Sequence, residues 1–164
     1  MNPDSARPVT KIRPLLAEDF VLCNLGAEDR DGALREIAAF LGARIPGLTA
    51  DAIFESLLGR EKLGSTAVGG GFAIPHSQVA GLEAPRIGLA LSPRGVAFES
   101  LDGRPTHVFF VILGSPERPA QNLQLLAAVA SLIRMGGRLA AVLPQARTPR
   151  QVLDGLAREE EGRK

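Results

Sequence analysis

The chain has little cysteine and almost no net charge. Its 164 residues include one cysteine, Cys23, and carry a formal net charge of +1. A single cysteine cannot form a disulfide within the chain, and the apolar run from Phe20 to Leu25 around it indicates a buried strand residue. The balanced charge gives no electrostatic reason to expect binding to nucleic acid or to an anionic membrane. We therefore expect a cytoplasmic protein with no disulfide framework and no nucleic-acid partner.

Long hydrophobic runs are also absent. The run from Val108 to Leu113 is among the longest, and it is far shorter than the roughly 18 residues of a transmembrane helix. Residues 1–14 are polar and contain Pro3, Pro8 and Pro14, so they do not form the hydrophobic part of a secretory signal. These absences predict no membrane insertion.

Two well-known glycine motifs are missing from the glycine-rich segment 60–76. No Gly-Lys-Ser/Thr sequence follows its glycines, which excludes a P-loop. The residues after Gly69–Gly71 are Phe72, Ala73 and Ile74, so the third glycine of a dinucleotide fingerprint is absent. The sequence therefore predicts no nucleotide cofactor, and we expect no metal site.

The same segment ends in a proline and a histidine, Pro75 and His76. Proline fixes its own φ and pushes Ile74 toward an extended conformation, which gives His76 a defined direction. An imidazole beside a loop rich in backbone N–H groups and an arginine, Arg60, suits the handling of a phosphoryl group. The alternative interpretation is an ordinary hydrogen-bonded histidine in a loose loop.

Periodicity and turn signals predict an α/β fold. We expect a single domain with three layers, α/β/α, in which helices flank a central mixed sheet of four to five strands. The expected domain covers residues 14–158, between a flexible N-terminal tail (1–13) and a charged C-terminal tail (159–164). The expected elements are strands at 20–25, 87–91 and 106–113, a turn at 92–95, and helices at 29–42, 49–59, 119–135, 139–143 and 148–158.

Two expectations concern side chains outside the glycine-rich segment. The helix that opens at Pro119 has apolar residues at helical spacing, and we expect its buried stripe to comprise Leu123, Leu126, Ala127, Ala130 and Ile133. His107 begins the strand at 106–113, so we interpret it as structural rather than catalytic.

Two motifs stand in a specific order: Arg60-Glu61-Lys62-Leu63-Gly64-Ser65-Thr66 comes first, and Gly71-Phe72-Ala73-Ile74-Pro75-His76 follows. In this order they resemble the signature of a known protein family, the type-2 enzyme IIA domains of the bacterial phosphotransferase system. This is the fructose and mannitol class together with its nitrogen-regulatory members. The resemblance extends through Phe98, Asp102 and Pro105 to the helix after Pro119.

The resemblance implies a function and a set of site residues. His76 is expected to accept a phosphoryl group on Nε2 from the carrier protein HPr, and Arg60 matches the active-site arginine of the family. Glu61 either supports the site or pairs with a nearby base. Ser65 and Thr66 either donate hydrogen bonds near the site or cap a turn.

The sequence also departs from the family pattern. Asn122 stands where family members carry a second active-site histidine; it can donate a hydrogen bond but cannot become a cation. Ser77 stands where a glycine often follows the histidine. We expect a nitrogen-type regulatory phosphocarrier. The alternatives are a binding module without phosphotransfer, and a sugar-specific subunit that feeds a separate enzyme IIB.

Overall fold

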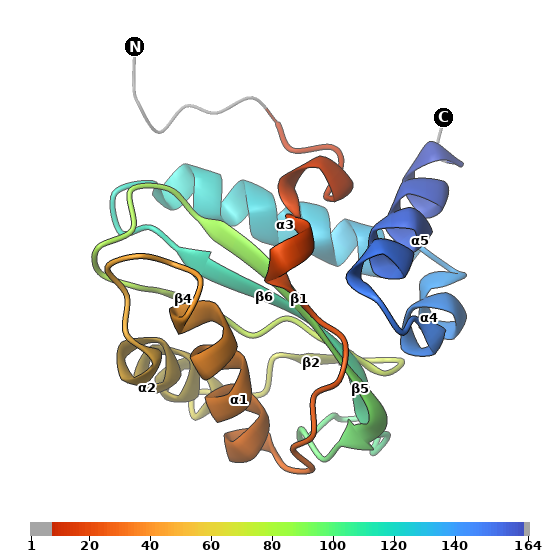
Figure 1. Cartoon of the computed structure of the whole chain (residues 1–164), viewed down its shortest axis with the longest axis horizontal. Coiled ribbons are helices and arrows are strands. Elements are labelled where there is room, and N and C mark those ends of the chain that lie inside the picture. The colour runs from red at the N-terminus through yellow and green to blue at the C-terminus, as the bar shows by residue number, and fades with distance from the viewer. Residues whose placement is uncertain (1–7, 163–164) are drawn as a thin grey trace.

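The computed structural model describes residues 8–162 and shows helices on both sides of a mixed β-sheet (Figure 1). This confirms the expected α/β class. Besides short 3₁₀ turns, the helices are α1 (Arg30–Gly42), α2 (Ala50–Glu61), α3 (Pro119–Met135), α4 (Leu139–Val142) and α5 (Pro149–Glu161). The strands are β1 (Val21–Leu22), β2 (Ala67–Gly69), β3 (Phe72–Ala73), β4 (His76–Gln78), β5 (Arg86–Val96) and β6 (Thr106–Gly114).

The sheet is built around the antiparallel pair β5 and β6, with Leu89 opposite Phe110. Strand β1 runs parallel to β5 on one side, while β3 and β4 both run parallel to β6 on the other. Strand β2 pairs with β3 in the antiparallel sense and completes a sheet of six strands. The sheet has more strands than the expected four to five, because β2, β3 and β4 are short strands within and just after the segment interpreted as a glycine loop.

Helices α1 and α2 cover one face of the sheet, and α3, α4 and α5 lie on the other (Figure 1). The first two are capped at their N-termini: the side chains of Asp29 and Thr49 accept hydrogen bonds from the N–H groups of Gly32 and Ala52. In the described part of the chain no single helix is long and apolar enough to cross a membrane. Helix α3 and residues Leu139–Gln145 pass that test only together, with a bend of 86° between them.

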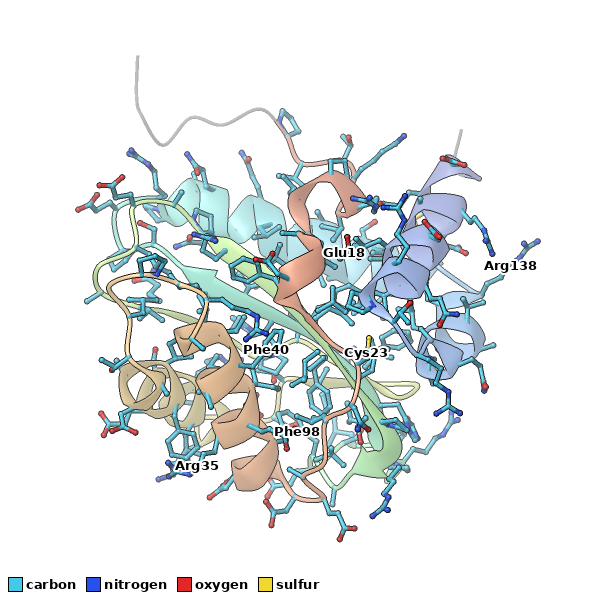
Figure 2. All side chains as sticks on the ribbon, viewed as in Figure 1. Glu18, Cys23, Arg35, Phe40, Phe98 and Arg138 are labelled. Atoms are coloured by element: carbon cyan, nitrogen blue, oxygen red, sulfur yellow. The ribbon has the colours of Figure 1, made fainter. Side chains whose placement is uncertain are left out.

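Aromatic rings fill the middle of the core. Phe98, which is labelled in Figure 2, packs edge to face on Phe109 with ring centroids 5.1 Å apart. Phe72 stacks on Phe110 at 6.4 Å. These contacts hold β3, β6 and the loop after β5 together, and so fix the strands that carry the candidate site.

Two local expectations were wrong. Cys23 lies just after β1 and is half-buried rather than buried within a strand (Figure 2); its partial burial raises the pKa of its thiol. Residues 92–95 do not form a separate turn. They continue β5 through an irregularity in its pairing with β6 between Leu91 and Val96, because a β-bulge accommodates the proline and glycine there.

The described residues near the two chain ends pack against each other. Residues 1–7 and 163–164 of the two expected tails lie outside the described residues. Ile12 is 1% exposed, and Glu160 in the last turn of α5 is 4% exposed. The Glu160 carboxylate accepts hydrogen bonds from the backbone N–H groups of Ile12 (2.6 Å) and Arg13 (2.7 Å). A buried carboxylate needs such partners, so this pairing fastens the start of the domain to its last helix.

The buried stripe of α3 also differs from the expected one. The fully buried residues are Leu125, Val129 and Leu132, whereas Leu123 is 67% exposed. Helix α3 is apolar on several sides, so helical spacing alone fits more than one stripe. Of the expected stripe, Leu126, Ala130 and Ile133 are partly buried and pack against the edge of the core.

Candidate functional site

His76 stands at the point where the chain re-enters the sheet after Pro75. The proline has no N–H to donate, so the pairing with β6 is interrupted between β3 and β4. Its carbonyl still accepts a hydrogen bond from the N–H of Ile112 at 2.9 Å. His76 then opens β4 in register with Ile112. The proline thereby delivers the imidazole at a strand start rather than in a loose loop.

The imidazole of His76 is oriented by the chain just before it. Its Nδ1 lies 2.7 Å from the carbonyl oxygen of Ile74. A carbonyl oxygen can only accept, so Nδ1 must carry the proton. In the neutral ring, Nε2 therefore keeps its lone pair and is the nucleophilic nitrogen.

The half-buried His76 side chain lines a pocket of about 320 Å³, here called the His76 pocket. Its walls come from β4, the end of β6 and the first turns of α3; they include Pro119, Asn122, Leu123 and Leu126. The exposed Leu123 and the half-buried Leu126 give the pocket an apolar rim on the α3 side. A rim of this kind suits contact with another protein.

Asn122 lines the same pocket as His76, and its amide is engaged with the backbone. Its Nδ2 donates to the carbonyl of Ser115 at 2.7 Å, and its Oδ1 accepts from the N–H of Ser115 at 2.9 Å. A Cβ added to Gly114 would lie 2.9 Å from Asn122 Cγ, so only glycine permits this approach. The side chain thus fixes the turn between β6 and α3.

Arg60 lies in the last turn of α2 rather than beyond the helix end, where it was expected. One turn earlier on the same helix face, the Ser56 hydroxyl lies 2.5 Å from the hydroxyl of Ser77, the neighbour of His76. The Arg60 guanidinium donates to the carbonyl of Gly64 at 2.8 Å. It is not among the residues that line the His76 pocket.

Glu61, Thr66 and Ser65 fasten the loop after α2. Glu61 and Thr66 are buried, and the Glu61 carboxylate accepts from both the N–H and the hydroxyl of Thr66. The Ser65 hydroxyl donates to the carbonyl of Phe98 at 3.1 Å. The partner of Glu61 is therefore a threonine rather than a base, and of the two roles expected for Ser65 and Thr66 the turn cap fits these contacts.

The serine pair Ser56 and Ser77 was not identified from the sequence. Ser56 donates its proton to the carbonyl of Gln78 at 2.8 Å. Because a hydroxyl has one proton, Ser77 must be the donor within the pair. This contact ties α2 to β4 beside His76. Neither serine shows a local pattern that would reveal it, because the residues are far apart in sequence.

The second histidine, His107, is also oriented by a backbone carbonyl, but it lies at a different place in the sheet. Its Nδ1 lies 2.8 Å from the carbonyl oxygen of Ser92. It lies on β6 five positions before Ile112, which is about 17 Å along a strand. His107 therefore lies well away from the His76 pocket.

The glycine run does not reach the His76 pocket, contrary to the expected arrangement. Gly69, Gly70 and Gly71 have φ values of 85°, 66° and 90°, which only glycine adopts readily. They make the tight turn between β2 and β3. The N–H of Gly70 donates to Asp102 at 2.9 Å. The Ser100 hydroxyl together with the N–H groups of Gly70 and Arg104 lowers the pKa of Asp102 to about 2.

Comparison with known proteins gives one family match that covers most of the chain. Residues 14–158 match the family model described as phosphoenolpyruvate-dependent sugar phosphotransferase system, EIIA 2. A relative from Bradyrhizobium diazoefficiens, named nitrogen regulatory protein, is 41% identical over 123 residues. That alignment covers 75% of this chain and 80% of the relative.

Solved structures share the fold. The nitrogen regulatory protein IIA-Ntr from Neisseria meningitidis superposes with a TM-score of 0.79 at 25% identity, covering 88% of this chain and 98% of that one. The Escherichia coli mannitol IIA, solved in complex with phosphorylated enzyme IIB, superposes with a TM-score of 0.71 at 18% identity. It covers 87% of this chain and 99% of that one. At this low identity the mannitol protein supports the fold alone.

Proposed function

The chain belongs to the type-2 EIIA family of the phosphoenolpyruvate-dependent sugar phosphotransferase system, and from this membership we propose that it is a regulatory phosphocarrier that accepts a phosphoryl group on His76. The observation that carries the proposal is the hydrogen bond from His76 Nδ1 to the Ile74 carbonyl at 2.7 Å. That bond leaves Nε2 as the nucleophile, at the wall of a pocket.

In the proposed step, the Nε2 lone pair attacks the phosphorus of a phosphohistidine on the donor protein. A new P–N bond forms at His76 while the donor P–N bond breaks, and its electron pair returns to the donor imidazole. The His76 ring becomes more positive as Nε2 gives up its lone pair. The carbonyl of Ile74 stabilises that charge through the Nδ1 proton, so no proton leaves His76 during the transfer.

Two features support stabilisation of the phosphoryl charge. Pro119, the first residue of α3, lines the His76 pocket, so the positive end of the helix dipole lies beside the place where the phosphoryl oxygens would sit. Arg60 is the second candidate. We propose that its guanidinium exchanges the neutral Gly64 carbonyl for the charged phosphoryl oxygens, which are stronger acceptors.

The partners follow from the family. We assign the donor role to an HPr-type carrier and place the relay in the cytoplasm, where phosphoenolpyruvate is made. A regulatory rather than a sugar-transport role is supported by the relative named nitrogen regulatory protein. A sugar-specific role with a separate enzyme IIB remains the alternative, which the mannitol complex illustrates for that protein.

The test is phosphorylation with purified components. The protein is incubated with phosphoenolpyruvate, enzyme I and HPr, and its intact mass is measured before and after brief acid treatment. We expect a mass gain of one phosphoryl group that acid removes, as a phosphohistidine requires. If no mass is gained with a donor that phosphorylates a control IIA protein, the phosphocarrier proposal fails. The chain would then be a binding module that signals by contact alone.

A further inference from the structure

A second pocket, of about 240 Å³, lies on the side of α3 away from His76. Gln121, Gln124 and Leu125 line its α3 wall. Each residue turns a helix by about 100°, so this wall lies roughly opposite Leu123 and Leu126, which line the His76 pocket. We call the second pocket the Arg86 pocket, after the arginine in its lining. It is separate from the proposed phosphoryl site.

The Arg86 pocket is mostly apolar. The N-terminal segment, red in Figure 1, passes beside α3 and supplies one wall, and the start of β5 supplies another. The apolar lining includes Leu15, Phe20, Pro85, Ile87 and Leu125. An apolar cavity with a few polar groups is the usual form of a small-molecule site. At roughly 30 Å³ for each water-sized volume, the pocket holds about eight non-hydrogen atoms.

Arg86 is the first residue of β5, and its side chain stacks on an aromatic ring. The guanidinium carbon lies 4.8 Å from the ring centre of Phe20, which is itself 7% exposed. Stacking covers one face of the guanidinium and leaves its N–H edge available to a planar acceptor such as a carboxylate. Arg86 is half-buried, so its charge has lost part of its water.

The guanidinium of Arg86 has no acidic partner in the described part of the chain. Ion pairs within residues 8–162 form at Arg30, Arg94 and Arg150, and none forms at Arg86. A half-buried cation without a carboxylate gains from an anion that enters its pocket, because a charge-assisted hydrogen bond is stronger than a neutral one. The pocket is therefore complementary to a ligand that is anionic at one end and apolar elsewhere.

We propose that the Arg86 pocket binds a small monocarboxylic acid whose apolar body has roughly five or six carbon atoms. The carboxylate pairs with the Arg86 guanidinium. The apolar body fills the space between Leu15, Ile87 and Leu125, all of which line the pocket. This inference does not depend on phosphoryl transfer at His76.

Other occupants fit the lining less well. A bare anion such as inorganic phosphate would leave the apolar walls uncovered. A dicarboxylate would bring a second charge that finds no partner, because Arg86 is the only charged side chain among the described residues that line the pocket. The chain could also supply its own carboxylate from residues 1–7, which lie outside the described residues and contain one acidic residue, Asp4. The experiment separates these cases.

The experiment titrates the full ¹⁵N-labelled chain with hexanoate and with hexanamide, which has nearly the same shape and no charge. Amide chemical shifts are followed by NMR. We expect hexanoate to shift the amides of Ile87 and Leu125 and to saturate with a Kd of roughly 1 mM, as suits a ligand of this size. Hexanamide should bind about tenfold more weakly, because it lacks the charge that pairs with Arg86.

The role of Arg86 is tested with two matched arginine changes on β5. Arg86→Gln should weaken hexanoate binding about tenfold and hexanamide binding less than about twofold, so that the preference for the charged probe disappears. Arg94→Gln should change either affinity less than about twofold, because the Arg94 side chain is 83% exposed and does not line the pocket.

The cavity is tested by filling it. Ala84 lines the pocket and is exposed, so Ala84→Leu should fold normally and weaken both probes about fivefold or more, because its side chain occupies the space they need. Ala52→Leu, at an exposed position of α2, should leave both affinities unchanged. His76→Ala should also bind hexanoate normally, which keeps this inference distinct from the proposed function.

Several results would overturn the inference. One is that hexanoate does not bind below about 20 mM, or that it binds no more tightly than hexanamide. Another is that Arg86→Gln and Arg94→Gln behave alike. Displacement of hexanoate by equimolar inorganic phosphate would assign the pocket to a bare anion. A roughly tenfold gain in hexanoate affinity in Asp4→Asn would assign the pocket to the first residues of the chain itself.

Discussion

The imidazole of His76 and the carbonyl of Ile74 form a hydrogen bond of 2.7 Å within one short stretch of chain. Donor and acceptor are two positions apart in sequence, and Pro75 lies between them. Proline restricts the backbone on both sides of itself. The motif therefore carries its own orienting group, and the tautomer of His76 is set locally by a backbone carbonyl.

His76 is predicted to be the only phosphorylated residue. His76→Ala should abolish the acid-labile mass gain, because it removes the proposed nucleophile. His107→Gln should retain the mass gain, since His107 lies on β6 away from the His76 pocket and forms a hydrogen bond with the Ser92 carbonyl. Intact mass after incubation with the donor system measures both. Label that persists on His76→Ala would refute the assignment.

Arg60 is predicted to act on the transfer step more than on the fold. A charge-assisted hydrogen bond contributes about 1.5–3 kcal/mol, so Arg60→Ala should slow phosphoryl acceptance by roughly 10- to 150-fold. The free energy of unfolding should change little, because the guanidinium donates a hydrogen bond to the carbonyl of Gly64, which is exposed. Lys62→Ala, an exposed cation just past the same helix end, is the control. Rapid-quench kinetics and thermal unfolding measure the two effects, and a large loss of melting temperature with normal transfer would reverse the assignment.

Asn122 is predicted to hold the turn between β6 and α3. Asn122→Leu leaves the N–H and carbonyl of Ser115 without their side-chain partner, which should lower the free energy of unfolding by about 1–3 kcal/mol. Asn24→Leu makes the same chemical change at an exposed position and should alter it by less than about 0.5 kcal/mol. Urea unfolding measures both, and equal stabilities would show that the Ser115 contact contributes nothing.

Glu160 is predicted to be a main stabilising contact between the two ends of the domain. Glu160→Ala removes two short hydrogen bonds to the N–H groups of Ile12 and Arg13. We expect a loss of about 2–4 kcal/mol in the free energy of unfolding, because charged hydrogen bonds are strong and both donors lose their partner. The neighbouring Glu161 is exposed, so Glu161→Ala should have little effect. Comparable losses in the two variants would contradict this role.

Asp102 is predicted to make stability depend on pH in the acid range. Hydrogen bonds from Ser100, Gly70 and Arg104 lower its pKa to about 2 in the folded protein, from an ordinary value of 3.8. A lowered folded-state pKa stabilises the fold above pH 3.8, and this contribution is lost as the pH falls toward 2. The advantage of the wild type over Asp102→Asn should therefore be constant near neutral pH and shrink between pH 4 and 2. A difference that does not vary with pH would exclude this contribution.

Several elements were predictable because their signals are local. The caps Asp29 and Thr49 lie next to the helices that they begin. Pro75 acts on its immediate neighbours, and the motifs at 60–66 and 71–76 indicate the family because each is a continuous stretch of sequence. The glycine run was wrongly expected to form part of the phosphoryl site, because its positive φ angles serve the turn between β2 and β3.

The sequence by itself determined which residues share a face of each helix, that Pro75 sets the direction of the backbone at His76, and which family the chain resembles. Only the tertiary structure decided which apolar side of α3 faces the core. It also decided that Asn122 forms hydrogen bonds with the backbone of Ser115, and that Glu160 accepts one from the N–H of Ile12. Periodicity reports how side chains are arranged around one element. It carries no information about which distant segment will cover them, because that depends on packing between residues far apart in the chain.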